Sequence, residues 1–383
     1  MTTKIACIAG ARPNFMKIKP VLDALAAAGH DVDLVHTGQH HDAEMSDVFF
    51  KDLGLRRPDV HLGSGSGSVA VQAARVLEAF DPYLVEAAPA MVIVVGDVTS
   101  SLACAFAAAQ RGSLVAHVEA GLRSHDWAMP EEVNRVVIDR ISTLLFAPSP
   151  DAVDNLADEG RDGQSVHLVG NVMIDSLLAN LDRALDRPLP HPVMVDGDFI
   201  LATLHRPSNV DDPVVLDGIL AALRAVSDRL PVVVPAHPRL AAHLDADRRD
   251  AVGDGVIFVE PMGYLDFIAA QQRARLIITD SGGIQEESTA LGTPCLTVRE
   301  STERPITVTE GTNRVIGTNS FDIEAAVHDT LTDAPAPRCP ALWDGQAGRR
   351  IAEVITTTLQ PRTAANTIDP RVPASTRRRN DTV

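Results

Sequence analysis

The chain has 383 residues, of which 45% are hydrophobic and 22% are charged, and its formal net charge is −17. This content is enough for two hydrophobic cores and excludes a disordered chain. The negative charge argues against a broad surface for nucleic acid or an anionic membrane, and no apolar stretch reaches about 18 residues, so we expect a cytoplasmic protein without a membrane span.

In the first half, apolar runs of strand length alternate with longer segments of helical periodicity. The predicted strands are Lys4–Ala9, Asp33–His36, Met91–Val95, Leu114–Val118 and Thr143–Ala147. The predicted helices are Pro20–Ala28, Val69–Phe80, Ser100–Gln110 and Glu131–Ser142. Strands that are apolar throughout, without alternation, are typical of a parallel sheet covered by helices on both faces.

The same pattern restarts after Leu181–Asp196, where the string RPLPHPV predicts a break in regular structure. The second set of predicted strands is Phe199–Leu204, Pro231–Ala236, Val256–Val259, Arg275–Thr279 and Cys295–Val298. The helices between them include Pro213–Arg229 and Gly283–Leu291.

Two such sets predict an α/β fold of two doubly wound, Rossmann-like domains that face each other across a cleft holding the active site. We expect an N-terminal domain over residues 1–175 and a C-terminal domain over residues 176–345. A C-terminal helix at 346–362 is expected to pack back on the first domain, and the polar residues 363–383 are expected to form a disordered tail.

Several carboxylates lie where predicted strands end or a predicted helix begins. Asp97 and Glu119 each follow a strand, and Glu131 and Glu132 open a helix. A single carboxylate in such a place is usually a cap, whereas several that converge raise one another's pKa and divide the roles of acid and base. We favour the second interpretation, which predicts acid–base chemistry at the carboxyl ends of these strands.

Two loops have the composition of anion sites. Arg12 and Lys17 follow Gly10 at the start of the first helix, where free amides and the helix dipole favour an anion. Ser281–Gly283 joins a predicted strand to a helix, which lets its backbone approach a diphosphate, and Glu287 is placed one turn later to accept ribose hydroxyls. An exposed basic helix start and a simple helix cap are the alternatives.

Histidines and arginines end further strands of the second half. His205 and Arg206 follow one strand and His237 the next, where they are placed to meet developing negative charge, although each histidine alone also fits a structural role. Arg299 and Arg304 add cations at the same edge.

The sequence contains little that indicates a metal site, a disulfide bond or a dinucleotide-binding loop. The cysteines are Cys7, Cys104, Cys295 and Cys339; they form no CxxC pair and are interpreted as buried, reduced thiols. The string HHD at residues 40–42 lacks a second ligand pair at helical spacing, so no metal is predicted. The string GSGSGS at residues 63–68 lacks the third glycine of a dinucleotide fingerprint, and we predict a flexible connection and no NAD or other cofactor.

Taken together, the chain resembles the non-hydrolysing UDP-N-acetylglucosamine 2-epimerases, whose architecture is similar to that of a GT-B glycosyltransferase. The resemblance extends from about Lys4 to Ala352 and rests on the following strings in the family's order: GARPNFMK, TGQH, VVGDVTS, HVEAGLRS, MPEEVNR, GNVMID, TLHRPSNV, HPR, TDSGGIQEE and TERP. The chain departs from the commoner GTRP, GDTT and TERPE of the family in GARP, GDVT and TERPI.

By position, the resemblance implies roles for individual residues. It makes Asp97, Glu119, Glu131 and His205 catalytic. It makes the C-terminal domain nucleotide-binding and assigns substrate contacts to Arg12, Lys17, Arg206, Ser281, Gly282, Gly283 and Glu287. It places Gln39, His40 and His237 at a possible second, activating UDP-GlcNAc site.

The activity implied is reversible epimerisation at C2 between UDP-GlcNAc and UDP-ManNAc, through elimination of UDP to a 2-acetamidoglucal and its re-addition. A UDP-sugar substrate, a homodimer and a place in polysaccharide biosynthesis are implied with it. The alternatives are a GT-B glycosyltransferase, a hydrolysing epimerase that releases ManNAc and UDP, and a catalytically silent nucleotide-sugar sensor.

Overall fold

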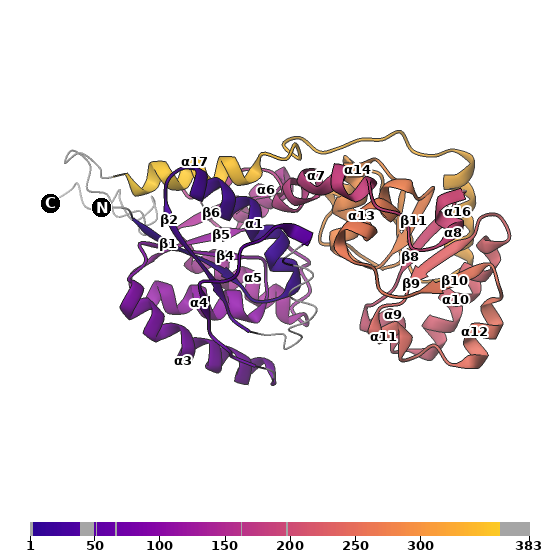
Figure 1. Ribbon diagram of the computed structural model, residues 1–383, viewed down its shortest axis with the longest axis horizontal. Helices are drawn as coiled ribbons and strands as arrows, with labels where there is room; N and C mark the ends of the chain where they lie inside the picture. The colour runs from indigo at the N-terminus through magenta and orange to yellow at the C-terminus, as the bar shows by residue number, and fades with distance from the viewer. Residues whose placement is uncertain are drawn as a thin grey trace. The chain divides into compact units, whose positions relative to one another are not determined.

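The computed structural model describes residues 3–38, 50, 52–65, 67–161, 163–196 and 198–360. The chain divides into two compact units, unit 1 (Met1–Ser176 with Ala341–Val383) and unit 2 (Leu177–Pro340), and each contains one parallel sheet (Figure 1). None of the helices in the described part is both long enough and apolar enough to cross a membrane.

The sheet of unit 1 has seven strands in the order β3-β2-β1-β4-β5-β6-β7. Their bounds are β1 (Lys4–Ala9), β2 (Asp31–His36), β3 (Val60–His61), β4 (Met91–Val95), β5 (Leu114–Val118), β6 (Leu144–Ala147) and β7 (Val166–Leu168). The helices of this part are α1 (Arg12–Ala27), α3 (Val69–Ala87), α4 (Thr99–Gln110), α5 (Pro130–Ile141), α6 (Pro150–Asp158) and α17 (Ala347–Leu359), and the unit boundary falls within α7 (Val172–Leu185).

The sheet of unit 2 has six strands in the order β10-β9-β8-β11-β12-β13. Their bounds are β8 (Ile200–Thr203), β9 (Val232–Pro235), β10 (Val256–Val259), β11 (Leu276–Thr279), β12 (Cys295–Thr297) and β13 (Asn313–Val315). The helices are α8 (Pro192–Asp196), α9 (Pro207–Val210), α10 (Pro213–Ser227), α11 (Pro238–Ala241), α12 (Ala246–Val252), α13 (Tyr264–Arg273), α14 (Gly282–Leu291), α15 (Ile306–Thr309) and α16 (Ser320–Thr332).

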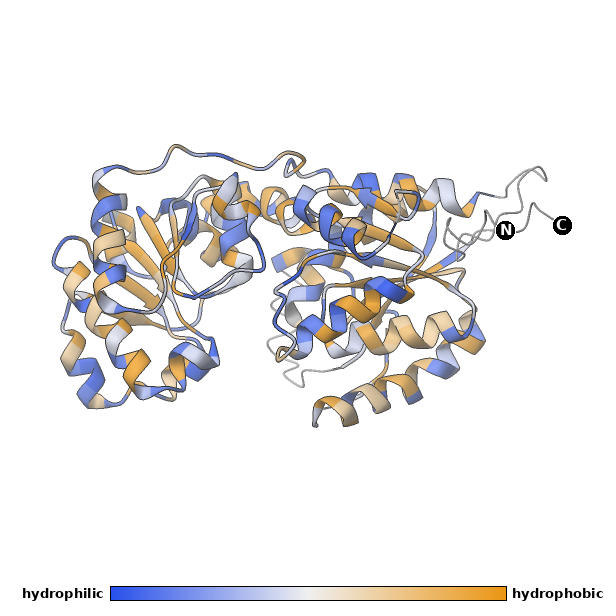
Figure 2. Cartoon of the chain, turned by 180° about the vertical axis from the view of Figure 1, so that it is seen from behind, coloured by the Kyte–Doolittle hydropathy of each residue, from blue (hydrophilic) through white to orange (hydrophobic). Residues whose placement is uncertain are grey.

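The strands are apolar because helices cover both faces of each sheet. Figure 2 shows hydrophobic residues along the strands and mixed surfaces on the helices. All five residues of β4 are buried, and so are all four residues of β11, which pairs with β8. The predicted α/β class with two doubly wound, Rossmann-like parts is therefore confirmed.

The structure corrects three local predictions. The first helix begins at Arg12 and not at Pro20, because the Ala11 amide donates to Asn14 Oδ1 at 2.8 Å and caps an earlier start. The edge strands β3, β7 and β13 were not predicted, since two or three residues are too short to show a period. Cys339 is exposed, whereas the other three cysteines are buried as expected.

The last described helix, α17, packs along α1 in unit 1 (Figure 1). Asp175 caps its N-terminus by accepting the amides of Ala347 and Gly348 at 3.1 and 2.7 Å. A Cβ at Gly348 would lie 2.6 Å from the carbonyl oxygen of Pro20, so the glycine permits this close approach of the two helices.

Candidate active site

Both sheets have a topological switch point, where the strand order reverses and open α/β sheets bind ligands. The reversal lies between β1 and β4 in unit 1 and between β8 and β11 in unit 2. Arg12 begins the helix that follows β1, Asp97 lies in the turn after β4, and His205 and Ser281 lie in the turns after β8 and β11. These four sequence-predicted residues thus lie at the position in each sheet that favours a ligand site.

Glu119 lies directly after β5 in a left-handed backbone conformation, with φ of 66°. This conformation is uncommon for a residue other than glycine and is typical of functional turns. The carboxylate is buried, and Lys17 Nζ donates to its Oε2 at 2.5 Å. A Cβ at Gly96 would lie 3.2 Å from the same oxygen, so the glycine leaves room for the ion pair. Lys17, which we predicted as a diphosphate contact, is here the partner of Glu119.

Asp97 is held by the neighbouring helix α5. Arg135 forms an ion pair with Asp97 Oδ2, and its other nitrogen, Nη1, lies 2.9 Å from Glu132 Oε2. Asn134 Nδ2 donates to the Asp97 backbone carbonyl at 2.7 Å. The Asp97 side chain is 32% exposed and that of Arg135 only 5%, so a buried cation supports an accessible carboxylate.

The adjacent glutamates of α5 have different surroundings. Glu132 is buried and accepts the amide and hydroxyl of Ser124 and the amide of His125, each at 2.9 Å. Burial opposes ionisation of Glu132, but these donors and Arg135 outweigh it and hold its pKa below the usual value. Glu131 is exposed in the first turn of the helix. The structure therefore assigns Glu132 to loop anchoring and leaves Glu131 accessible.

In unit 2, a buried carboxylate orients His205. Asp280 has no exposed surface, and its Oδ1 lies 2.8 Å from His205 Nδ1. The same carboxylate accepts the backbone amides of His205 and Arg206 and the side-chain amide of Asn209. Burial opposes its ionisation, but His205 and these amides outweigh burial and lower the pKa of Asp280. His205 Nδ1 thus contacts Asp280, and the His205 side chain is 38% exposed.

Three arginines surround one carboxylate beside the start of α14. Glu303 lies 3.2 Å from Arg206, 2.8 Å from Arg299 and 3.0 Å from Arg304. Burial disfavours its charge, yet the three guanidinium groups lower the pKa of Glu303 well below its usual range. A Cβ at Gly282 would lie 2.7 Å from Arg304 Nη1, so the glycine lets this cationic group approach the helix start. The arrangement is suited to an anion.

Glu287, the predicted ribose contact, lies on α14 and is only 4% exposed. Gln271 Nε2 donates to its Oε2 at 2.6 Å. Burial raises the pKa of Glu287 to about 7, although hydrogen bonds from Gln271 and Tyr264 act to lower it.

The residues of the possible activating site are only partly described. His237 caps α11 by accepting the Arg239 amide through Nδ1 at 3.2 Å, and its ring centroid lies 5.5 Å from that of His205. Burial lowers the pKa of His237, and the charge of His205 acts in the same direction. Gln39 and His40 lie outside the described residues.

Two residues that contact the predicted site residues were missed from the sequence. Asp280 stands within the quoted string TDSGGIQEE, directly after β11, and that position was the available signal. Arg135 stands three residues after Glu132 on the same helix, but nothing in the string MPEEVNR indicates that it reaches Asp97.

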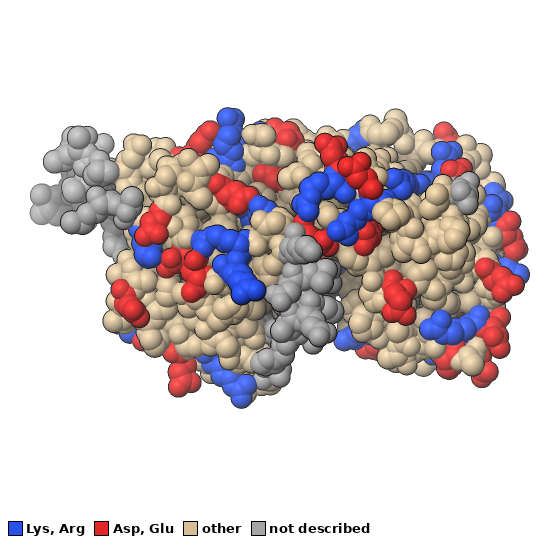
Figure 3. Space-filling model, in the orientation of Figure 1, with Lys and Arg blue, Asp and Glu red and all other residues tan. Residues whose placement is uncertain are grey.

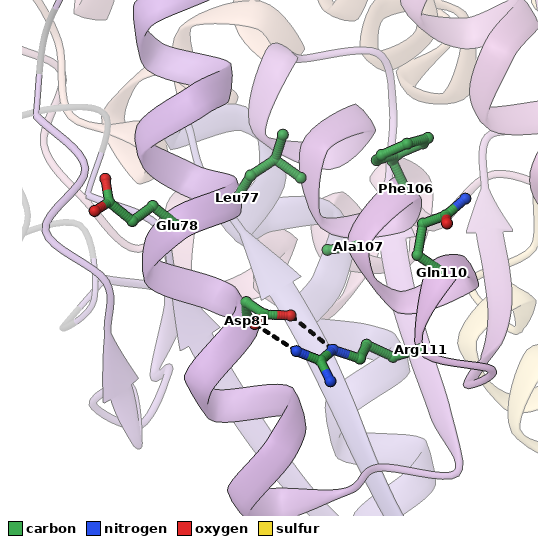
Figure 4. Close-up of a pocket in the computed structure, with 7 residues that line it drawn as sticks. All are labelled: Leu77, Glu78, Asp81, Phe106, Ala107, Gln110 and Arg111. Atoms are coloured by element: carbon green, nitrogen blue, oxygen red, sulfur yellow. Dashed lines mark hydrogen bonds and ion pairs between the residues drawn. The ribbon is translucent and has the colours of Figure 1, made fainter.

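Other surface features lie apart from these turns. A depression of about 500 Å³ between α3 and α4 is lined by Leu77, Glu78, Asp81, Phe106, Ala107, Gln110 and Arg111 (Figure 4). It adjoins the C-terminal end of α4, whereas Asp97 precedes the N-terminal end of that helix. Acidic and basic side chains are interspersed over the face drawn in Figure 3. Within the described ranges, no group of three or more His, Cys, Asp or Glu residues is arranged to hold a metal ion.

Comparisons with known proteins agree on one family. A sequence model described as UDP-N-acetylglucosamine 2-epimerase matches residues 23–356. A UDP-N-acetylglucosamine 2-epimerase from Methanocaldococcus jannaschii is 37% identical over 362 residues, which cover 92% of this chain and 99% of that protein. A UDP-2,3-diacetamido-2,3-dideoxy-D-glucuronate 2-epimerase from Pseudomonas aeruginosa is 39% identical over 356 residues, with the same two coverages.

The fold is also similar to a solved structure of such an enzyme. The crystal structure of M. jannaschii UDP-GlcNAc 2-epimerase in complex with UDP-GlcNAc and UDP matches with a TM-score of 0.82 and 36% identity. The match covers 92% of this chain and 99% of that chain.

Proposed function

The chain belongs to the UDP-N-acetylglucosamine 2-epimerase family, and we propose that it interconverts UDP-GlcNAc and UDP-ManNAc by inversion at C2 of the sugar. One observation carries this proposal: accessible and buried carboxylates gather at the ends of β4 and β5, where Asp97 and Glu119 follow these strands. Inversion at carbon needs one group to remove a proton on one face and another to deliver a proton on the other.

The proposed reaction begins with loss of UDP. The C2 proton is not acidic in the intact sugar, because no carbonyl group adjoins C2. The C1–O bond breaks, UDP leaves with the bonding electron pair, and a carboxylate removes the C2 proton, which yields 2-acetamidoglucal and UDP. In the return step a UDP oxygen forms the bond to C1 while a protonated carboxyl group delivers a proton to the opposite face of C2.

The carboxylates proposed for these proton transfers are Asp97, Glu119 and Glu131. Arg135 and Lys17 form ion pairs with Asp97 and Glu119 respectively, so a fixed cation lies beside each of these two carboxylates. Glu131 is exposed at the start of α5, where a proton is readily exchanged with water.

Departure of UDP requires stabilisation of the diphosphate, and most of the proposed groups belong to unit 2. His205, oriented by Asp280, is available to meet charge on the leaving oxygen. Arg206 and the amides at the start of α14 after Ser281 supply further donors. Arg12 and Glu287 are proposed as further contacts to the nucleotide.

A single time course in D₂O tests the proposal. Dialysed enzyme without added nicotinamide is incubated with UDP-GlcNAc and followed by ¹H NMR. We expect UDP-ManNAc to approach a constant ratio with UDP-GlcNAc, and both sugars to carry deuterium at C2. Conversion without deuterium at C2 would contradict the elimination mechanism.

The same experiment separates the rival enzyme classes. A hydrolysing epimerase accumulates free UDP and ManNAc, and a glycosyltransferase leaves the sugar unchanged until an acceptor is added. A nucleotide-sugar sensor binds without turnover.

The P. aeruginosa relative supports one second substrate. Because that protein is named for a 3-acetamido glucuronate sugar and is 39% identical, the corresponding UDP-sugar should be assayed beside UDP-GlcNAc. A larger kcat/KM for that sugar would move the proposal to the other substrate without changing the chemistry at C2.

The proposal includes a homodimer that acts in the cytoplasm and supplies polysaccharide biosynthesis. Light scattering after size-exclusion chromatography measures the mass of the assembly directly, and a mass equal to one chain would overturn the dimer.

A further inference from the structure

A network of buried charged side chains lies next to the carboxylates of unit 1, and the proposed chemistry does not use it. His117, the fourth residue of β5, is fully buried. Its Nδ1 lies 2.6 Å from Oδ1 of Asp139 on α5, and its Nε2 lies 3.1 Å from the backbone carbonyl oxygen of Gly96. The ring therefore connects a helix to the turn after β4.

Both neighbours of the His117 ring are hydrogen-bond acceptors. A backbone carbonyl has no proton to donate, and a neutral imidazole donates through only one nitrogen. Burial opposes ionisation of Asp139, but His117 and Arg123 outweigh it and hold the pKa of this carboxyl below its usual value. Asp139 is therefore an acceptor as well, and both contacts form at once only when both ring nitrogens carry a proton.

The charges around the ring balance. Arg123 lies 2.7 Å from Asp139 and forms two hydrogen bonds of 2.7 Å with Glu159, so a doubly protonated His117 ring would bring the set to two cations and two carboxylates. The register partners of His117 on β4 and β6 are Val94 and Leu145, which carry no charge. A buried imidazolium is compatible with this environment because its partners are ionic and fixed.

The contacts of the network end at the two turns that carry the proposed catalytic carboxylates. Gly96 directly precedes Asp97, and Gly96 and Glu119 both have left-handed backbones, with φ of 62° and 66°. Asp139 Oδ2 accepts the amide of Gly121 at 3.1 Å, two residues after Glu119. One buried pair thus restrains the backbone on both sides of the reacting groups.

We propose that His117 is a structural imidazolium that keeps both ring protons at neutral pH. Together with Asp139 it acts as a positioning residue that sets the separation of the Asp97 and Glu119 carboxylates. The positioning role rests on the proposed function, whereas the protonation state of His117 does not.

The protonation state is tested on the enzyme labelled with ¹⁵N-histidine. Long-range ¹H–¹⁵N correlation spectra report whether each ring nitrogen carries a proton, and His117→Gln assigns the His117 signals by their loss. We expect both His117 nitrogens to be protonated at about pH 8, where an ordinary exposed histidine is neutral. One protonated and one bare nitrogen, the pattern of a neutral ring, would overturn the proposal.

The positioning role is tested with His117→Gln, Asp139→Asn and the control Glu159→Gln. The control removes charge from the same network but leaves the contacts to Gly96 and Gly121 in place. At temperatures where circular dichroism shows each variant folded, we expect His117→Gln and Asp139→Asn to lower kcat on the order of 10- to 100-fold with a smaller change in KM. Glu159→Gln should lower only the unfolding midpoint.

Two results would overturn the positioning role. One is a loss of kcat in all three variants that simply follows their unfolding midpoints. The other is an unchanged kcat in folded His117→Gln. If Asp139→Asn fails to fold, His117→Gln decides alone. An inactive wild-type enzyme would instead count against the proposed function, and the ring-nitrogen spectra would still decide the protonation state.

Discussion

The switch points of the two sheets have opposite arrangements of charge. In unit 1 the Asp97 side chain is 32% exposed and rests on Arg135, which is 5% exposed. In unit 2 the His205 side chain is 38% exposed and rests on Asp280, which has no exposed surface. Each pair keeps the group offered to a ligand accessible and buries its partner, where charge interactions are stronger. In these two pairs we therefore expect the more exposed member, whatever its residue type, to be the one that acts on a ligand.

The pair of Lys17 and Glu119 differs from both. Their side chains are 13% and 3% exposed, so neither member is freely accessible. The pair requires Gly96 at its side and a strained backbone at Glu119. Such strain is retained where the surrounding structure over-determines it, as the buried network beside β5 does here.

The largest expected effect tests at α5 whether the more exposed group is the reacting one, because the two adjacent glutamates of this helix differ in exposure. Glu131→Gln should lower kcat by about 10²- to 10⁴-fold, because an accessible acid–base group is lost, and should leave the unfolding midpoint near wild type. Glu132→Gln should destabilise the fold by about 1–3 kcal/mol, because a buried acceptor of amide protons is weakened. Steady-state kinetics and urea unfolding of both variants make the test.

The reverse pattern would contradict this assignment. If Glu132→Gln removed activity while remaining as stable as wild type, and Glu131→Gln did not, then the exposed member of the pair would not be the reacting one. The rule that exposure identifies function would fail at this helix.

The next effect concerns the buried partner in unit 2. Asp280→Asn should lower kcat by about tenfold or more. The backbone amides of His205 and Arg206 now donate to the Asp280 carboxylate, and the asparagine side chain would place an N–H donor against them. A matched control is Asp212→Asn, an exposed cap of α10 in the same unit, which keeps its capping oxygen and should change neither kcat nor stability.

Unchanged kcat in folded Asp280→Asn would show that His205 needs no fixed partner. The comparison between the units would then reduce to a difference in packing, without consequence for the reaction.

The sequence predicted regular elements better than it predicted partners. The strands β1, β4, β5 and β10 have the bounds that we predicted, because continuous apolar runs between turn residues define a buried parallel strand. The turns that carry the candidate site residues followed from those strands, since a parallel sheet places its carboxyl ends at one edge.

The missed residues share a physical cause. Asp280 is 75 positions from His205, and Arg135 is 38 positions from Asp97, so no local pattern records either contact. Glu131 and Glu132 are chemically identical in the sequence, and only the face of α5 on which each lies separates a loop anchor from an accessible acid.

A smaller effect, visible as a pH dependence, is expected at Glu287. This buried carboxylate of unit 2 accepts from the amide of Gln271, and burial raises its pKa to about 7, whereas the pKa of an unfolded glutamate is about 4.3. Because the folded state binds the proton more tightly, the stability that this group contributes is complete below about pH 4.3 and is lost as the pH rises through about 7.

Glu287→Gln should therefore lose less stability than wild type between about pH 5 and about pH 8. Urea unfolding midpoints of the two proteins at both pH values measure the difference. An identical decrease in both proteins would show that Glu287 is ionised throughout this range, and that a buried acid in unit 2 needs no cation to keep its charge.

The smallest effect is expected at the depression between α3 and α4 (Figure 4). It contains an ion pair in which both members are exposed, whereas each pair discussed above has a buried member. The side chains of Asp81 and Arg111 are each 47% exposed, and such surface pairs contribute little because water screens both partners. Asp81→Asn should leave kcat and the unfolding midpoint within experimental error. A clear loss of activity would mean that a site at the C-terminal end of α4 serves the reaction, and the assignment of chemistry to the switch point of this sheet would have to be abandoned.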